Sequence, residues 1–299
     1  MQFFFAYPEI TGADDDMLDA GALDEVARAL EQAGFDGLSL TEHPMPGARW
    51  LDNGGHQTLD PFVGLGFAAA VSNRLRLLTH LSVATYRNPF LLAKTAATVD
   101  KLSSGRMVLG IGVGYLKTEF FSLGVDFAER NALFDEVLDV LPLHWRGESF
   151  SYKGLHFDAR DVIARPRPVQ DPIPIWIGGN ARISRRRAAL RAQGWMPMPG
   201  GAELSTAART AQIPDVATLG RMIAEVQQDA AAAGREPIEI MWTYLDRSVG
   251  RPTVDTDRHR EVFAELERVG VTCLGISPKT KESAATLEFI DAFGRTYLQ

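Results

Sequence analysis

Hydrophobic residues recur along the chain in eight short runs, and most of these runs are unbroken rather than alternating with polar positions. Unbroken apolar runs of this length are typical of strands that are buried on both faces. Pro197 lies inside the sixth run, which makes that run the least strand-like because proline donates no ladder hydrogen bond. The eight predicted strands are Phe3–Tyr7, Gly37–Leu40, Leu75–Val83, Met107–Ile111, Ile173–Ile177, Trp195–Met198, Ile238–Trp242 and Thr272–Ile276.

Between these runs the apolar residues change to spacings of three and four, which predict amphipathic helices. The clearest helix start is Asn88-Pro89, because asparagine caps helices and proline fits the first helical position. We expect that helix to end at Gly105, a favourable C-cap residue. The other helical stripes are Leu23, Val26 and Leu30; Leu133, Val137, Leu138 and Leu141; Leu219, Met222, Ile223 and Val226; Phe263, Leu266 and Val269; and Leu287, Ile290 and Phe293.

Eight strands that alternate with helices predict an α/β fold, a (β/α)8 TIM-type barrel formed as a single domain over residues 1–299. An open doubly wound sheet is the competing architecture. Long insertions follow strands 2, 4 and 6, at Thr41–Asp60, Tyr115–Pro172 and Pro199–Pro214, and the middle one contains a pattern that predicts a hairpin at Ser149–Phe157. In a barrel these insertions lie at the carboxyl ends of the strands, where active sites are built.

Composition narrows the classes of partner. The 299 residues carry a formal net charge of −7, which argues against a nucleic-acid partner. Cys273 is the single cysteine, so no disulfide can form within the chain. The apolar start Met1–Ile10 is too short for a signal sequence, and no run of about 18 apolar residues predicts a membrane span. We therefore expect a cytoplasmic protein with no membrane partner.

Two glycine-rich segments each follow a predicted strand. One contains Gly110, Gly112 and Gly114, and the other reads Gly178-Gly179-Asn180. Glycine allows backbone amides to approach an anion or a flat ring closely, so the pair suggests a phosphate-bearing cofactor. The even spacing does not meet the dinucleotide fingerprint G-x-G-x-x-G, and the chain has neither a P-loop nor an H-E-x-x-H motif. The six histidines are scattered, so we expect no metal site.

The second strand ends in Thr41-Glu42-His43-Pro44. Pro44 favours an extended conformation for His43, which would project the imidazole into the barrel mouth. Imidazole titrates near neutral pH, which suits proton transfer. A histidine packed under a loop is the other interpretation of the same pattern.

Several of these segments resemble the bacterial luciferase-like superfamily. They are EHP after strand 2, LDPF at Leu59–Phe62, the block Tyr86–Tyr115, the segment Arg165–Asn180 and GWMP at Gly194–Pro197. The resemblance covers roughly the first 200 residues in order, and within the superfamily the chain is most similar to the deazaflavin (coenzyme F420)-dependent oxidoreductases. The Tyr86–Tyr115 block is specific to the superfamily but not to a substrate.

The resemblance implies a flavin or deazaflavin across the barrel mouth, with Glu42 and His43 beside the ring as the catalytic residues. It also implies a bulge with a non-prolyl cis peptide within Thr79–Leu81. The cofactor-binding residues that it implies are Thr79, His80 and Ser82 on strand 3, Gly112, Val113, Gly114 and Tyr115 after strand 4, and Gly178, Gly179 and Asn180 after strand 5. Backbone amides at Gly179, Asn180 and Ala181 would bind phosphate.

One position departs from the family pattern. The sugar-phosphate-oxidising deazaflavin dehydrogenases carry a glutamate where this chain has Tyr115, so oxidation of that sugar is not expected. Arg182 and Arg185–Arg187 follow the phosphate turn and either meet the acidic tail of F420 or form a solvated helix face. Residues proposed to line a substrate pocket, or to pack in loops, are Trp50, His56, Met196, Met198 and Trp242.

The resulting hypothesis is an oxidoreductase that transfers a hydride between coenzyme F420 and a small organic substrate. An FMN-dependent luciferase-like monooxygenase is the first alternative, and a non-catalytic flavin-binding protein is the second. The resemblance also implies a homodimer.

Overall fold

The computed structural model describes residues 1–9, 16–200, 205, 210–278 and 280–299. The insertion after strand 6, Pro199–Pro214, therefore lies partly outside the described residues. The strands of the main sheet are β1 (Gln2–Ala6), β2 (Gly37–Leu40), β3 (Arg76–Thr79), β4 (Ser82–Val83), β5 (Met107–Gly112), β8 (Ile175–Gly178), β9 (Gly194–Met196), β10 (Glu239–Thr243) and β11 (Cys273–Ile276).

These strands form a closed parallel barrel, which confirms the predicted fold and excludes the open sheet. The order β3-β2-β1-β11-β10-β9-β8-β5 is closed by pairing of β3 with β5. β3 and β4 are two parts of the third predicted strand, so the described residues provide the eight strand positions of a TIM-type barrel. The sixth strand ends at Met196, one residue before Pro197, so the prediction that it continues to Met198 was wrong.

The third strand contains one extra residue. Leu78 pairs with Val108 and Ser82 pairs with Ile111, so four steps along this strand match three along β5. Such an insertion is a β-bulge, which re-aims the side chains beside it. The peptide bond between His80 and Leu81 within the bulge is cis. The bulge and the cis peptide implied for Thr79–Leu81 are both confirmed.

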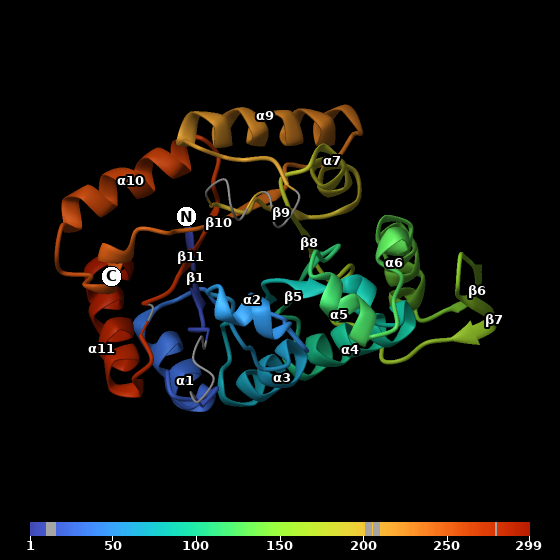
Figure 1. Ribbon diagram of the computed structural model, residues 1–299, viewed down its shortest axis with the longest axis horizontal. Helices are drawn as coiled ribbons and strands as arrows, with labels where there is room; N and C mark the ends of the chain where they lie inside the picture. The colour runs from blue at the N-terminus through green and yellow to red at the C-terminus, as the bar shows by residue number, and fades with distance from the viewer. Residues whose placement is uncertain (10–15, 201–204, 206–209, 279) are drawn as a thin grey trace.

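The helices form a ring around the barrel, with α10 and α11 on one side, α7 and α9 on another, and α1 and α3 opposite them (Figure 1). None of the helices in the described segments has the length and hydrophobicity needed to cross a bilayer. Their bounds are α1 (Leu23–Ala33), α2 (Ala48–Asp52), α3 (Pro61–Val71), α4 (Pro89–Leu102), α5 (Lys117–Ser122), α6 (Arg130–Arg146), α7 (Arg182–Arg191), α9 (Val216–Ala232), α10 (Thr256–Arg268) and α11 (Ser283–Phe293).

Most helical predictions hold, with differences at the ends. The Asn88 side chain accepts hydrogen bonds from the amides of Phe90 and Leu91, as expected for the cap of α4. That helix ends at Leu102, and Gly105 lies beyond it with a positive φ of 88°, so Gly105 is not the cap. α3 was not predicted, because its sequence PFVGLGFAAAV is apolar on every face and has no helical periodicity. The predicted hairpin is present as β6 (Ser149–Lys153) and β7 (Asp158–Ile163) and projects from the barrel (Figure 1).

The buried side chains fall into two clusters that the barrel wall separates. The larger cluster fills the space between strands and helices. The smaller one fills the barrel interior and consists of Phe4, Leu78, Val108, Trp176, Met196, Met241 and Cys273, with Leu81 packed against it. Arg76 and Glu239 lie below the interior cluster, where two hydrogen bonds of 2.8 and 2.9 Å join β3 to β10. The amino-terminal end of the barrel is therefore filled by these side chains.

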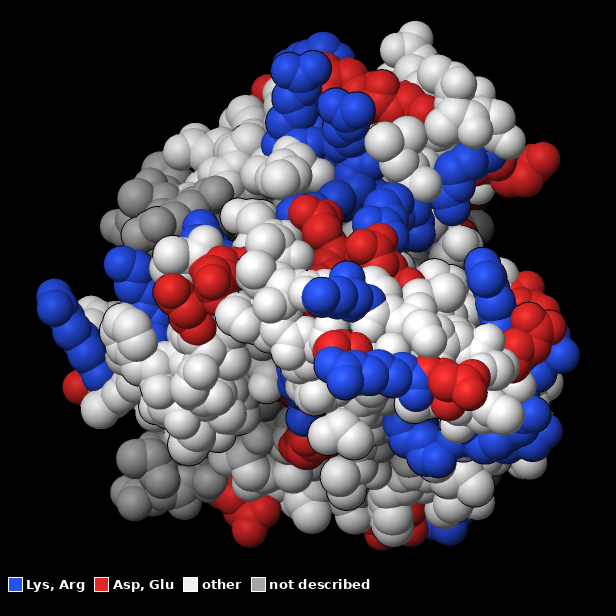
Figure 2. All heavy atoms as spheres, turned by 90° about the vertical axis from the view of Figure 1, so that its right-hand side faces the viewer, with Lys and Arg blue, Asp and Glu red and all other residues white. Residues whose placement is uncertain are grey.

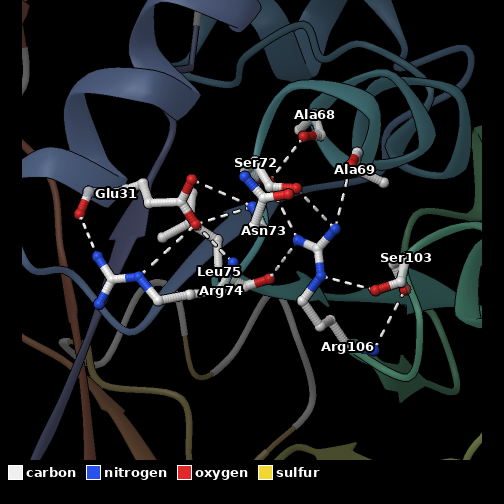
Figure 3. Close-up of polar contacts among 9 residues, drawn as sticks. All are labelled: Glu31, Ala68, Ala69, Ser72, Asn73, Arg74, Leu75, Ser103 and Arg106. Carbon is white, nitrogen blue, oxygen red and sulfur yellow. Dashed lines mark hydrogen bonds and ion pairs between the residues drawn. The ribbon is translucent and has the colours of Figure 1, made fainter.

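Arg106 joins three elements near the amino end of β5. Its guanidinium donates to the carbonyls of Ala69, Ser72, Leu75 and Ser103 and to the Ser72 hydroxyl, over 2.7 to 3.0 Å (Figure 3). The carbonyls of Ala69 and Ser72 belong to the end of α3, whose last carbonyls have no partner within the helix.

Replacing Arg106 with methionine is expected to lower the free energy of unfolding by about 3 kcal/mol. The side chain would keep its aliphatic part but leave several buried carbonyls without a donor. Chemical denaturation measures the change. The matched control is Arg160→Met, since the Arg160 side chain is 84% exposed, and its effect is expected to stay below about 0.5 kcal/mol. Equal effects of the two substitutions would contradict this role of Arg106.

Candidate active site

Glu42 connects the ends of the second and third strands at the barrel mouth. Its carboxylate is buried and accepts hydrogen bonds from the Ser82 hydroxyl at 2.8 Å and the Val83 amide at 2.7 Å. Arg87 donates to the same carboxylate and also pairs with Asp60 at 3.0 Å. Burial raises the pKa of Glu42, and the Arg87 charge and these hydrogen bonds offset part of that rise. The structure therefore brings Glu42 and Ser82 together. The Glu42 carboxylate already accepts hydrogen bonds from three donors of the protein, namely Ser82, Val83 and Arg87.

His43 follows Glu42 and is also buried at the mouth. Its Nδ1 lies 3.4 Å from the Oε1 of Glu119, a fully buried carboxylate on α5. The other Glu119 oxygen accepts a 2.8 Å hydrogen bond from the Tyr86 hydroxyl. Burial and the Glu119 charge hold the pKa of Tyr86 well above its usual range. His43, Glu119 and Tyr86 therefore form one chain of polar contacts inside the protein.

Glu119 is the functional candidate that the sequence analysis missed. It lies four residues after Tyr115, within KTEFFS, and no periodicity in that short segment distinguishes a buried glutamate from an exposed one. Helical spacing does not relate Tyr115 to Glu119, because Tyr115 precedes α5, which begins at Lys117. The carboxylate that lies beside His43 therefore comes from α5 and not from position 115.

The insertion after β2 covers His43. The Trp50 ring, on α2, lies 4.6 Å from the His43 ring and 5.2 Å from the His56 ring, measured between centroids. The His56 Nε2 atom lies 3.3 Å from the Glu9 carboxylate. Trp50 and His56, two of the predicted lining residues, are therefore at the mouth.

Other predicted lining residues lie elsewhere. Met196 is in the barrel interior, and half-buried Trp242 packs against the cluster outside the barrel. The Met198 amide and carbonyl are bonded to the Asn180 side chain. The interpretation of Met196 and Trp242 as residues of a substrate pocket is therefore incorrect, because alternation along a strand turns Met196 inward below the mouth and Trp242 outward.

The three polar residues of the third strand have different surroundings. Thr79 is fully buried, and its hydroxyl donates to the Gly110 carbonyl at 2.7 Å. That hydroxyl hydrogen is therefore already used in a bond within the barrel wall. Ser82 donates to Glu42, as described above. His80 is partly buried beside the mouth, and burial lowers its pKa to about 4 although the Glu9 charge acts in the opposite direction. His80 is therefore neutral at pH 7.

The glycines at the ends of β5 and β8 make room for side chains of the protein itself. A Cβ atom at Gly112 would lie 2.7 Å from Leu81, and one at Gly178 would also meet Leu81. At Gly114, where φ is +83°, a Cβ would lie 2.6 Å from Val83. The bulge thus inserts Leu81 between two glycines, above the interior cluster, where it forms an apolar floor for the mouth. Val113 lies between Gly112 and Gly114 in the sequence, and its carbonyl accepts a 3.0 Å hydrogen bond from the Thr85 hydroxyl.

Tyr115 borders the mouth on the side of His43, with 6.3 Å between the two ring centroids. Burial and the charges of Glu119 and Glu9 raise the pKa of Tyr115 to about 12. The phenol is therefore neutral near pH 7 and cannot act there as a carboxylate would.

The predicted phosphate turn is largely occupied by bonds within the protein. The Gly179 amide donates to the Met196 carbonyl at 3.2 Å, and the Asn180 amide donates to the Thr210 hydroxyl at 2.7 Å. The Asn180 side chain is fully buried and joins the loops after β8 and β9 through three hydrogen bonds. Asn180 therefore fixes loop geometry. α7 begins directly afterwards, and its N-cap residue Ala181 provides no side-chain cap for the first turn.

The arginines of α7 differ in their environment. Arg187 is buried and forms two 2.7 Å hydrogen bonds with Asp135 of α6, so it does not reach a cofactor tail. Arg185 pairs with Glu225 of α9 at 3.0 Å. Figure 2 shows Lys and Arg side chains gathered over α7 and α9 with acidic side chains among them. The groove between these helices has a volume of about 610 Å3 and includes the exposed Arg182 and Arg186.

The mouth has one further polar feature. Ser277 follows β11, and among the described residues its buried hydroxyl oxygen has no hydrogen-bond partner. The same part of the chain contains no group of three or more His, Cys, Asp or Glu side chains arranged to hold a metal ion. The mouth therefore combines an apolar floor, a buried imidazole–carboxylate pair and a free hydroxyl group.

A family model described as luciferase-like monooxygenase matches residues 1–245. An uncharacterised protein of Mycobacterium tuberculosis is 33% identical over 186 residues, which are 58% of this chain and 66% of that protein. An F420-dependent glucose-6-phosphate dehydrogenase of Beutenbergia cavernae is 34% identical over 181 residues, 59% of this chain and 52% of that protein. The match thus covers less than two thirds of the length of each of these two relatives.

Among solved structures, the chain is similar to monooxygenase RslO1 from Streptomyces bottropensis. The TM-score is 0.76 at 21% identity, over 100% of this chain and 99% of that one. At this identity the likeness supports the barrel fold and not a shared activity.

Protonation of His80 is expected to destabilise the fold in acid. Its pKa is about 4 in the folded protein and 6.5 when unfolded, so the unfolded chain binds the extra proton first as pH falls. Stability is therefore lost below pH 6.5, by about 3 kcal/mol once pH reaches 4. Replacing His80 with asparagine should reduce this loss in urea unfolding at pH 7 and pH 4. Replacing exposed His156 is the control, and equal pH slopes for wild type and His80→Asn would contradict the argument.

Proposed function

This chain belongs to the luciferase-like monooxygenase family, and from that membership we propose that it is an oxidoreductase that transfers a hydride between coenzyme F420 and a small organic substrate in the barrel mouth. The name of the Beutenbergia relative, an F420-dependent dehydrogenase, supports the choice of cofactor. The observation that carries the proposal is the buried pair of His43 and Glu119 at the mouth, 3.4 Å apart.

His43 is the residue that manages the proton in this proposal. Bound F420 supplies or accepts the hydride, and the reacting oxygen or carbon of the substrate must gain or lose a proton in the same turnover. An imidazole beside the substrate can hold that proton, and Glu119 beside Nδ1 orients the ring. Trp50 lies over His43 and limits the access of water.

The residues of the mouth fit a deazaflavin. Leu81 offers an apolar surface on which a flat ring can lie, and the Ser277 hydroxyl, which has no partner among the described residues, can bond to a polar edge. The anion site differs from the one expected from sequence, because the amides of Gly179 and Asn180 are already bonded. The first turn of α7, which has no side-chain cap, is the better place for the phosphate.

The substrate is proposed to be a carbonyl compound or an electron-poor alkene rather than a sugar phosphate. Tyr115 occupies the position of the acid found in the sugar dehydrogenases, and its raised pKa of about 12 keeps it neutral. The only carboxylate that reaches His43 among the described residues is Glu119, which is fully buried behind the ring. His43 itself would then carry the proton to or from the substrate.

An FMN-dependent monooxygenase is the second candidate. It is favoured by the closed cover over His43, since oxygenation by a flavin requires exclusion of water. A flavin-binding protein without turnover is the third candidate. That candidate gives no reason for a buried imidazole–carboxylate pair. Burial of such a pair costs desolvation energy, which a role in catalysis would explain.

Replacing His43 with glutamine is expected to lower turnover about 100-fold or more, because the proton would have no carrier. The assay mixes reduced F420 anaerobically with a panel of carbonyl compounds and electron-poor alkenes. F420 binding, measured by fluorescence, should change less than about threefold.

Gln57→Ala is the control for this assay. Gln57 lies in the same insertion after β2 that covers His43, and it lines a small neighbouring cavity. Loss of turnover with equal loss of F420 binding would make His43 a binding residue only. Turnover with FMN and oxygen, and none with F420, would transfer the proposal to the monooxygenase.

An acidic cap at Ala181 is expected to compete with the phosphate of F420. Asp at this position should stabilise α7 by up to about 1 kcal/mol and weaken F420 binding about tenfold, through occupation of the amides and charge repulsion. Ala181→Asn is the matched uncharged variant and should have a smaller effect. A deazaflavin without phosphate should bind all three proteins equally. Unchanged F420 affinity in the Asp variant would exclude α7 as the anion site.

The proposal includes a homodimer formed through the outer face of α3. Val63 is 73% exposed and Phe67 is 53% exposed one turn later, so α3 presents an apolar strip on both its inner and outer sides. A second copy of the same strip would cover it in an isologous contact. Phe67→Glu is expected to give a monomer by light scattering, whereas Arg160→Glu, on the hairpin, should not. A monomeric wild type would contradict the proposed dimer.

A further inference from the structure

We infer that His56 and Glu9 form a proton relay that returns a proton to His43 between turnovers. The inference rests on the proposed function, because it concerns the same site. It adds two residues that neither the family pattern nor the sequence analysis connected with the proton. His56 acts through His43 and does not itself meet the reacting atoms.

The geometry joins two imidazole–carboxylate pairs. His56 Nε2 lies 3.3 Å from Glu9, and His43 Nδ1 lies 3.4 Å from Glu119. The two imidazole rings meet edge to face, with 4.9 Å between centroids and 78° between planes. At this separation a rotation of one ring, or one intervening water molecule, would bring their nitrogen atoms into contact.

Exposure falls in steps along this chain of groups. The exposed fraction of the side chain is 28% for Glu9, 19% for His56, 8% for His43 and 0% for Glu119. The series runs from the most exposed of the four groups to the innermost carboxylate. Trp50 contacts both imidazole rings and covers them from the side of α2, so water does not reach His43 directly from that side. Glu9 and His56 are thus the graded route between solvent and His43.

The surrounding titratable groups favour this route. Thr41 donates a 2.9 Å hydrogen bond to Glu9 and holds the carboxylate toward His56. His80, on the neighbouring strand, has a pKa lowered to about 4 and stays neutral, so it does not compete for the proton. Tyr115, on the other side of His43, has a pKa raised to about 12 and keeps its own proton.

The relay satisfies the proton balance of the proposed reaction. When a carbonyl is reduced, its carbon receives the hydride from reduced F420 and its oxygen takes the proton of His43. Reduced F420 would also give up a second hydrogen, which would leave to solvent as a proton and balance the reaction. His43 is then neutral, and one proton must return to it before the next turnover. In the oxidising direction the same groups carry the proton outward.

The first test uses the protein without cofactor. With 15N-labelled histidine, NMR measures how fast the His43 ring proton exchanges with solvent, and the His43→Gln spectrum assigns the signal. Exchange is expected to be at least about tenfold slower in His56→Gln, with Glu9→Gln as a second variant and Gln57→Ala as the neighbouring control. Added imidazole should restore fast exchange. Unchanged or faster exchange in both variants would overturn the relay.

The second test uses the loaded enzyme. In His56→Gln the first turnover should proceed within about twofold of the wild-type rate, because His43 already holds one proton, and later turnovers should be at least about tenfold slower. Equal slowing of the first and later turnovers would overturn the relay. A wild-type protein that never oxidises reduced F420 would instead refute the proposed function, and the exchange experiment would still decide whether protons pass through His56.

Discussion

The mouth of this barrel depends on the one extra residue in its third strand. The bulge ends the regular ladder between β3 and β5 and turns Leu81 into the barrel, between the glycines at 112 and 178. Beyond the bulge, the Val83 amide and the Ser82 hydroxyl both bond to Glu42. Because Glu42 is fixed in this way, His43 is placed next to it with its ring toward α5. The imidazole–carboxylate pair therefore follows from backbone geometry on a neighbouring strand.

The same constraint gives the glycines a structural reason. From sequence they suggested a cradle for a cofactor, whereas the structure uses two of them to admit Leu81 and the protein bonds the amides of Gly179 and Asn180 itself. These two uses of glycine are compatible, because the floor that Leu81 forms is a surface on which a flat ring could lie. In the proposed function the phosphate therefore binds a few residues later, at the uncapped first turn of α7.

Much of the architecture could be predicted because burial leaves a pattern in sequence. Unbroken apolar runs gave all eight strand positions, and Asn88-Pro89 gave a helix start, since both signals are local. The contacts of the candidate site are not local: His43 and Glu119 are 76 positions apart, and the short segment around Glu119 does not reveal which residue it meets. α3 was missed for the opposite reason, because a helix that is apolar on all sides has no periodicity to detect.

The central claim, that the mouth is built for a deazaflavin, is tested most directly by equilibrium binding. The purified protein would be titrated against oxidised F420 and against FMN under the same conditions, with fluorescence quenching as the signal. We expect F420 to bind with a Kd in the micromolar range or below and FMN to bind about 100-fold more weakly. Tighter binding of FMN, or binding of neither compound, would contradict the claim.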